Sequence, residues 1–172
     1  MIFDTHAHYD DEQFDADREE LLSGMKAGGV GMIVDAAAAV ASWDKILELT
    51  EKYPFDFVIG SVHLIHGQDP YYRGFFEGRS DEEAYREAFQ VTIENLKKID
   101  SFDSLGHLDY VVRYGAHQAE AYSYRKYAEE IDEILKHLIS HGKGLEMNMA
   151  GMKYGLGFPN PHPDVIRRYK EL

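Results

Sequence analysis

Ile2-Phe3-Asp4-Thr5-His6-Ala7-His8 opens the chain, and the fold can be read outward from this stretch. Its apolar start predicts a β-strand, on which side chains two residues apart point to the same side. His6 and His8 would therefore share one face of the strand with Asp4. An HxH pair at the end of an apolar strand is typical of a metal site, so we interpret both histidines as metal ligands.

Two later segments end their apolar runs in the same way. They are Gly60-Ser61-Val62-His63 and Gly106-His107-Leu108-Asp109. A parallel β/α sheet or barrel gathers the C-terminal ends of its strands on one face, so His63 and His107 are predicted to join the first pair at one metal. Taken separately, each could equally be a hydrogen-bonded histidine at a strand end. Their shared placement favours ligation.

Short apolar runs alternate with longer stretches of helical periodicity along the whole chain, which is the signature of βα repeats. We therefore expect an α/β fold, a single domain over residues 1–172 and about five parallel strands. The predicted strands run approximately from Ile2 to His8, Gly31 to Ala36, Phe57 to His63, Ser104 to Val111 and Gly144 to Ala150. Helices are predicted near Asp15 to Ala27, from Ser42 to Pro54, after a capping box at Ser80 to Glu83, from Ser123 to Ser140 and from His162 onward.

The segment from His66 to Arg79 is too long and too aromatic for a plain connection. One interpretation is that it covers an active site. The other is that its aromatic residues pack the loop onto the edge of the domain. The residues in question are Tyr71, Tyr72, Phe75 and Phe76.

Four further polar residues are candidates for the same site. Asp109, two residues beyond His107, could orient an imidazole or act as a base. Arg113 lies just beyond the predicted fourth strand, where its guanidinium could grip a phosphate or form a surface salt bridge. Glu146 and Asn148 face one way on the predicted fifth strand, and polar side chains there need partners, which favours a substrate-binding or supporting role.

Composition narrows the classes of function. The chain has no cysteine, so imidazole and carboxylate are its only strong ligands, a set suited to Zn, Mn or Fe. A net charge of -13 argues against nonspecific nucleic-acid binding and suits a small cationic substrate. No apolar run approaches the ~20 residues that cross a bilayer, and no signal pattern opens the chain. We expect no membrane partner and a cytoplasmic location.

Two segments resemble two families of metal hydrolases. Residues 57–172 are similar to the histidinol-phosphatase branch of the polymerase and histidinol phosphatase (PHP) superfamily, and residues 1–55 resemble the opening of TatD-type metal-dependent deoxyribonucleases. The stretches that carry the PHP resemblance are Val58 to His63, Asp69 to Tyr72, Phe75 to Ser80, Leu105 to Gly115 and Gly142 to Asn148. Both families open their first strand with HxH.

The resemblance implies a phosphomonoesterase that holds two or three divalent metals on a partial or distorted TIM-like barrel. His6, His8, His63 and His107 occupy matching ligand positions, and Arg113 matches a residue expected to contact phosphate. L-histidinol phosphate would be the substrate, and its positive amine fits the acidic balance of the chain.

This sequence also departs from the PHP pattern. The second strand ends in Val34-Asp35-Ala36-Ala37 where the family has Ser-Asp-His, and a metal-bridging Glu has no counterpart. The family's last ligand-bearing strand would begin just after Leu172. Five strands leave a barrel open, and the exposed sheet edges favour pairing with another copy.

The leading interpretation is a histidinol-phosphatase-type enzyme acting on a small phosphorylated substrate, with its completeness and level of activity left open. One alternative is a TatD-like deoxyribonuclease, which the first third suggests and the net charge weakens. The other is an inactive metal-binding fragment that oligomerises.

Overall fold

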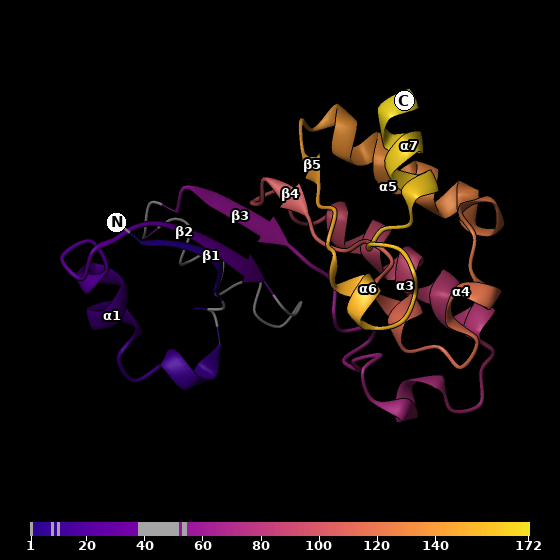
Figure 1. The fold of residues 1–172 in the computed structure, drawn as a ribbon, viewed down its shortest axis with the longest axis horizontal. Coiled ribbons are helices and arrows are strands. Elements are labelled where there is room, and N and C mark those ends of the chain that lie inside the picture. The colour runs from indigo at the N-terminus through magenta and orange to yellow at the C-terminus, as the bar shows by residue number, and fades with distance from the viewer. Residues whose placement is uncertain (1, 8, 10, 38–51, 53–54) are drawn as a thin grey trace.

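The computed structural model describes residues 2–7, 9, 11–37, 52 and 55–172, with the backbone alone at residues 3–6 and 34–37. The helix predicted from Ser42 to Pro54 therefore lies outside the described residues, apart from Lys52. Figure 1 shows the first strands at one end of the molecule and most of the helices gathered at the other end, with the C-terminus among them.

The strands form one parallel sheet whose spatial order follows the chain, β1-β2-β3-β4-β5. Three strands make up most of it, and two strands of two residues extend it. The bounds are β1 Ile2–Ala7, β2 Val30–Ala37, β3 Phe57–Gly60, β4 Ser104–Leu105 and β5 Gly144–Leu145. The alternating pattern thus correctly predicts a parallel α/β fold. Within the described part of the chain, β1 and β5 are the sheet edges, so a TIM-like barrel remains a prediction.

The fourth strand is much shorter than the sequence predicts. It ends at Leu105, and the prediction that it continues to Val111 is wrong. His107 has a positive φ of 20°, and its carbonyl accepts a 2.8 Å hydrogen bond from the Tyr110 amide. The chain therefore turns after Gly106 and continues as a 3-10 helix, η4, over Tyr110–Arg113.

The third and fifth strands also stop early. β3 ends at Gly60, so His63 follows the strand instead of belonging to it. β5 ends at Leu145, and Ala150 begins a short helix. The residues that the sequence placed near the ends of the third, fourth and fifth strands therefore lie in the connections that follow them. They are His63, His107, Asp109, Glu146 and Asn148.

The helices agree with the sequence where local signals are strong. The capping box is present, since Ser80 Oγ accepts from the Glu83 amide and the Glu83 carboxylate accepts from the Ser80 amide.

Among the helices in the described residues, none combines the length and the apolar composition that crossing a bilayer requires. The α-helices are α1 Arg18–Gly24, α3 Asp81–Leu96, α4 Gln118–Ala121, α5 Ala128–Ser140, α6 Ala150–Lys153 and α7 Pro163–Glu171. The remaining 3-10 helices are η1 Glu12–Phe14, η3 Arg73–Phe76 and η5 Tyr124–Tyr127.

The main core lies between α3, α5 and the later strands, which Figure 1 shows close together. Phe89 of α3 and Leu135 of α5 are fully buried in it. A second, smaller cluster of Ala7, Tyr9 and Leu22 lies beneath α1. Because most of the buried apolar surface lies in the later part of the chain, that part holds the strand ends of β3 and β4 in place.

An ion pair connects α5 to α7. Arg168 donates to both oxygens of Asp132 at 3.0 and 2.6 Å, and these hydrogen bonds lower the Asp132 pKa to about 2. We expect Asp132→Asn to lower the melting temperature at pH 7 by about 2–4 °C. The wild-type pair contributes fully above about pH 4 and is lost as the pH falls toward 2, so the variant should lose less stability across that interval.

Thermal unfolding at pH 7, 4 and 2.5 measures this effect. Asp100→Asn is the matched control, because that carboxylate pairs with Lys143 at 3.1 Å on the surface and is 67% exposed. Equal pH slopes for the wild type and Asp132→Asn would show that the pair does not hold α7.

Candidate functional site

Two histidines from neighbouring strand ends meet in the structure. Nε2 of His63, after β3, lies 3.0 Å from Nε2 of His107, after β4, and the ring centroids are 4.8 Å apart. β3 and β4 are adjacent and parallel, so both connections leave the sheet at the same edge. His107 is buried and His63 is partly exposed. Such a pair either shares one proton or presents two lone pairs to one cation.

Contacts with the neighbouring strand ends fix the backbone of His107. Its amide donates to Oε2 of Glu146 at 2.9 Å. The preceding Gly106 has no room for a side chain, because a Cβ there would lie 2.4 Å from Oγ of the buried Ser61 and 3.3 Å from Glu146 Oε2. Close packing of three strand ends thus sets the position of the imidazole.

We expect Gly106→Ala to destabilise the fold by about 1–3 kcal/mol, because the added methyl overpacks this contact. The displaced groups include the acceptor of the His107 amide, so the site should be disturbed as well. Urea unfolding measures the loss. Gly74→Ala is the control, since nothing lies within 4 Å of a Cβ at that position. Equal stability of both variants would contradict the close approach.

Tyr110 connects the histidine pair to the long aromatic loop. Its ring stacks on His63 with centroids 4.4 Å apart and planes 13° apart. Its hydroxyl donates to Oδ1 of Asp69 at 3.2 Å, and burial raises the Tyr110 pKa well above its ordinary value. This contact brings the loop to the histidines.

The packing interpretation of the aromatic loop holds in part, and the covering interpretation stays a prediction. Phe75 is buried in the core, as the packing interpretation requires. Tyr71 and Tyr72 are 59% and 68% exposed, so they do not pack the loop onto the domain, and the Tyr71 ring meets Tyr114 edge-on at 5.6 Å. The exposed tyrosines remain candidates for covering a site.

Arg113 is buried on η4, and its described partners are neutral. Nε donates to Oδ1 of Asn160 at 2.7 Å, and Nη2 donates to Oδ1 of Asn148 at 3.2 Å. Its guanidinium lies over the Tyr110 and Tyr154 rings, 5.2 Å from each centroid. Among the described residues, no carboxylate forms an ion pair with it, so the predicted surface salt bridge is not found. A buried cation with neutral partners keeps its charge available for an anion.

Asp109 does not contact the histidines in the way that the sequence suggested. It is fully buried, and its oxygens accept from Asn160 Nδ2 at 2.6 Å and from the His162 amide at 2.8 Å. Burial raises the pKa of Asp109, and these hydrogen bonds oppose that shift. Because it lies beyond the end of β4, two-residue strand spacing does not put it on the same face as His107.

Glu146 and Asn148 lie between the histidine and the arginine. Asn148 Nδ2 donates to Glu146 Oε1 at 3.3 Å, so the two side chains form a chain from the His107 amide to the Arg113 guanidinium. Sequence reasoning missed Asn160, which is fully buried at the centre of this region. The Asn160-Pro161 dipeptide marks only a turn in the sequence, so no local signal indicated its role.

The predicted ligands of the first strand cannot be placed. The side chains of Asp4 and His6 and the whole of His8 lie outside the described residues. Within the part of the chain that the structure describes, no group of three or more histidine or carboxylate side chains could hold a metal ion. The described part of the candidate site is therefore the pair His63 and His107.

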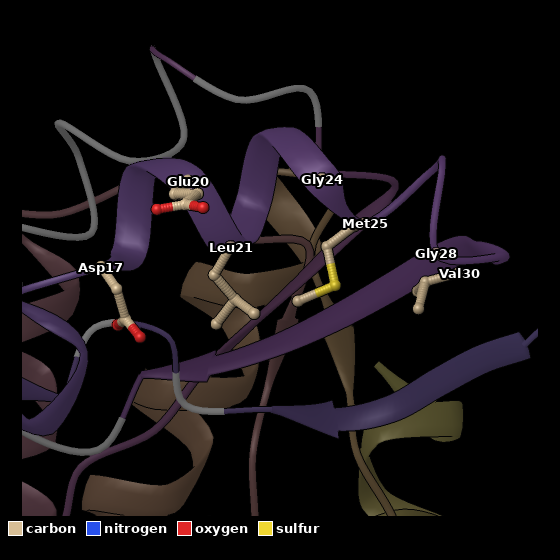
Figure 2. Close-up of a pocket in the computed structure, with 7 residues that line it drawn as sticks. All are labelled: Asp17, Glu20, Leu21, Gly24, Met25, Gly28 and Val30. Carbon is tan, nitrogen blue, oxygen red and sulfur yellow. The ribbon is translucent and has the colours of Figure 1, made fainter.

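A cavity of about 460 Å³ lies elsewhere, beneath α1 (Figure 2). Leu21, Met25 and Val30 give it an apolar lining, and among the described residues Asp17 and Glu20 are the charged groups that line it. The described lining has neither a histidine nor a cation, so it differs in chemistry from the strand-end site.

The fold and this site define a class of protein, a parallel α/β domain with imidazoles and a buried guanidinium gathered beyond the carboxyl ends of its strands. The chain belongs to the PHP domain family, whose pattern matches residues 5–150.

Individual proteins similar to this chain are consistent with membership of this family. A probable histidinol-phosphatase from Clostridium acetobutylicum is 34% identical over 125 residues, covering 72% of this chain and 48% of that protein. The histidinol-phosphatase of Lactococcus lactis is 38% identical over 106 residues, covering 60% and 39%. The crystal structure of histidinol phosphate phosphatase from Lactococcus lactis, complexed with zinc, L-histidinol and phosphate, matches with a TM-score of 0.68 and 26% identity, covering 93% of this chain and 61% of that chain. The chain spans about half the length, or less, of these curated relatives.

These comparisons support one family where the sequence suggested two. The PHP match begins at residue 5 and includes most of the segment 1–55 that resembled TatD-type deoxyribonucleases. A TatD-type opening is not supported. The His6-Ala7-His8 pattern misled the interpretation because it is common to both families.

Proposed function

We propose that this chain is a metal-dependent phosphomonoesterase that hydrolyses L-histidinol phosphate to L-histidinol and phosphate, as a cytoplasmic step of histidine biosynthesis. The observation that carries the proposal is the 3.0 Å approach of His63 and His107 beyond the strand ends, with the buried Arg113 guanidinium linked to His107 through Asn148 and Glu146. The names of the similar proteins support this substrate. The net charge of -13 fits its positive amine.

The histidine pair fits a divalent cation. Two imidazole nitrogens bound to one ion at ~2.0–2.1 Å lie about 2.8–3.4 Å apart for N–metal–N angles from 90° to tetrahedral, and the observed separation is 3.0 Å. We propose Zn, Mn or Fe, held by His63 and His107 with His6 and His8 as further ligands. When bound, the cation supplies polarisation of the phosphate ester and activation of a water molecule.

The other residues act around the reacting phosphate. The guanidinium of Arg113 binds phosphate oxygens and offsets the negative charge that builds up during hydrolysis. Glu146 and Asn148 lie beside the substrate, where one holds the His107 backbone and the other the Arg113 side chain. Asp109 remains a candidate for a role in catalysis. Because it contacts Asn160, it would act through that residue and not on the phosphate itself.

The proposal also includes the barrel architecture. We infer that the parallel strands are part of a distorted TIM-like barrel, an inference supported by the likeness to the Lactococcus lactis enzyme. The edges of β1 and β5 are the places where another copy of the chain could pair. Light scattering tests this, because a monomer at all concentrations would argue against edge pairing.

The deciding experiment measures phosphate release from L-histidinol phosphate by the 172-residue chain with Mn or Zn, and again after chelation. Turnover that depends on metal supports the proposal. Cleavage of single-stranded or duplex DNA without phosphatase turnover would favour the deoxyribonuclease alternative. Metal binding with neither activity would identify an inactive metal-binding fragment.

A further inference from the structure

In the described part of the chain, side-chain hydrogen bonds hold Arg113 through Nε and Nη2. A guanidinium carries five N–H donors, and two of them are used, one on Nε by Asn160 and one on Nη2 by Asn148. The Tyr110 and Tyr154 rings pack against it, each with its centroid 5.2 Å from Cζ. Among the described residues, the two Nη1 donors and the second Nη2 donor have no protein acceptor. One Nη1 donor and the second Nη2 donor form the terminal edge of the guanidinium, which can take two phosphate oxygens at once.

Asn160 determines which edge is presented. Its Nδ2 donates to the Asp109 carboxylate at 2.6 Å and its Oδ1 accepts from Arg113 Nε at 2.7 Å. This orientation of the amide is unambiguous, because a carboxylate only accepts and a guanidinium only donates. Reversing the amide would place Asn160 Nδ2 against Arg113 Nε, a donor against a donor, and Asn160 Oδ1 against the Asp109 oxygen, an acceptor against an acceptor.

The surroundings make this amide rigid. Asn160 is fully buried, and its backbone exchanges hydrogen bonds with the Asn148 backbone at 2.7 and 2.8 Å. The His162 amide fixes the second oxygen of Asp109. Both amides that hold Arg113 therefore belong to one hydrogen-bonded unit, and the buried Asp109 carboxyl group and the Arg113 guanidinium are joined through the single side chain of Asn160.

We propose that Asn160 is the positioning residue of the phosphate subsite: oriented by Asp109, it turns the Nη1–Nη2 edge of Arg113 toward the substrate phosphate. This inference rests on the proposed function for the identity of the anion. It gives Asp109 a role one step removed from the reacting atoms.

The test is calorimetric titration of inorganic phosphate into the purified 172-residue chain, without added metal, for the wild type and Asn160→Ala. We expect phosphate to bind the variant about 10- to 100-fold more weakly, because a hydrogen bond to a charged group is lost and the guanidinium is freed to turn. In phosphatase assays the same variant should raise KM and lower kcat. In an Arg113→Gln background, Asn160→Ala should have no further effect on phosphate affinity.

Asn95→Ala is the matched control. Asn95 is also a buried asparagine, but it lies near the end of α3 and makes no contact with Arg113. Its removal should leave the phosphate affinity unchanged. If Asn160→Ala does not fold, Asn148→Ala decides. It removes the longer Nη2 contact, together with the Asn148 contacts to Glu146 and to the Ala150 amide, and leaves the Nε contact with Asn160 in place, so a loss of several-fold is then expected.

Three results would overturn the inference: wild-type affinity in a folded Asn160→Ala or Asn148→Ala variant, an equal loss in Asn95→Ala, or no phosphate binding by the wild type. Failure of the proposed function looks different. A chain that binds phosphate, loses that binding in Asn160→Ala and hydrolyses no phosphomonoester retains the subsite without the reaction.

Discussion

His107→Ala should remove bound metal and lower kcat/KM for L-histidinol phosphate by at least about 100-fold. The substitution deletes one of two Nε2 atoms that lie 3.0 Å apart. Changing a residue that merely orients a metal ligand already costs about 10- to 100-fold in affinity or activity, so losing the ligand itself should cost at least as much. His63→Ala should give the same result, because the two rings act together.

Elemental analysis of protein purified without chelator, combined with phosphatase assays, measures both parts of this prediction. His141→Ala is the matched control, since His141 is an exposed histidine at the end of α5. A His107→Ala chain that keeps its metal and its turnover would show that the pair is a structural hydrogen bond. Loss of metal in His141→Ala would point to surface binding instead.

The parts of the fold that the sequence predicts well depend on local signals. The capping box at Ser80 and Glu83 marks the start of α3, and His162-Pro163-Asp164 marks the start of α7. Each signal acts within one helical turn, so it does not depend on the rest of the chain. The parallel order of the strands follows from their alternation with helices.

The segment Tyr110-Val111-Val112-Arg113 shows where such reasoning fails. Its apolar run reads as the end of a strand, yet it forms a 3-10 helix in which all four residues are buried. A short segment that is buried on every side has no hydrophobic period, so the sequence cannot distinguish a strand from a tight helix. Predictions that depend on strand alternation are wrong here for this reason. One of them is the shared strand face of His107 and Asp109.

The candidate site was predictable where residue chemistry is distinctive. Histidines after apolar runs and an arginine after the fourth run could be singled out from their neighbours in sequence. Asn160 could not, because its importance comes from contacts with residues 47 and 51 positions earlier in the chain. An asparagine in a turn is ordinary until those partners are known.

Arg113→Lys should lower kcat/KM for the phosphomonoester by about 100- to 1000-fold, a loss of transition-state stabilisation of about 2.7–4 kcal/mol. Lysine keeps the charge but has no planar fork, so it cannot donate to Asn160, Asn148 and two phosphate oxygens together. Its ammonium would also lose the flat contact with the Tyr110 and Tyr154 rings.

Arg86→Lys is the control for this substitution. Arg86 also lies over a tyrosine ring, 5.3 Å from the centroid of Tyr127, and it pairs with Glu130 on the side of α3 that faces α5. Its replacement should lower stability without a selective effect on turnover. Wild-type kinetics in Arg113→Lys, or an equal fall in Arg86→Lys, would mean that the buried guanidinium supports the fold and takes no part in binding phosphate. A large loss of kcat/KM confined to Arg113→Lys would show that the planar fork held by Asn160 and Asn148 is needed, because the substitution leaves the charge unchanged.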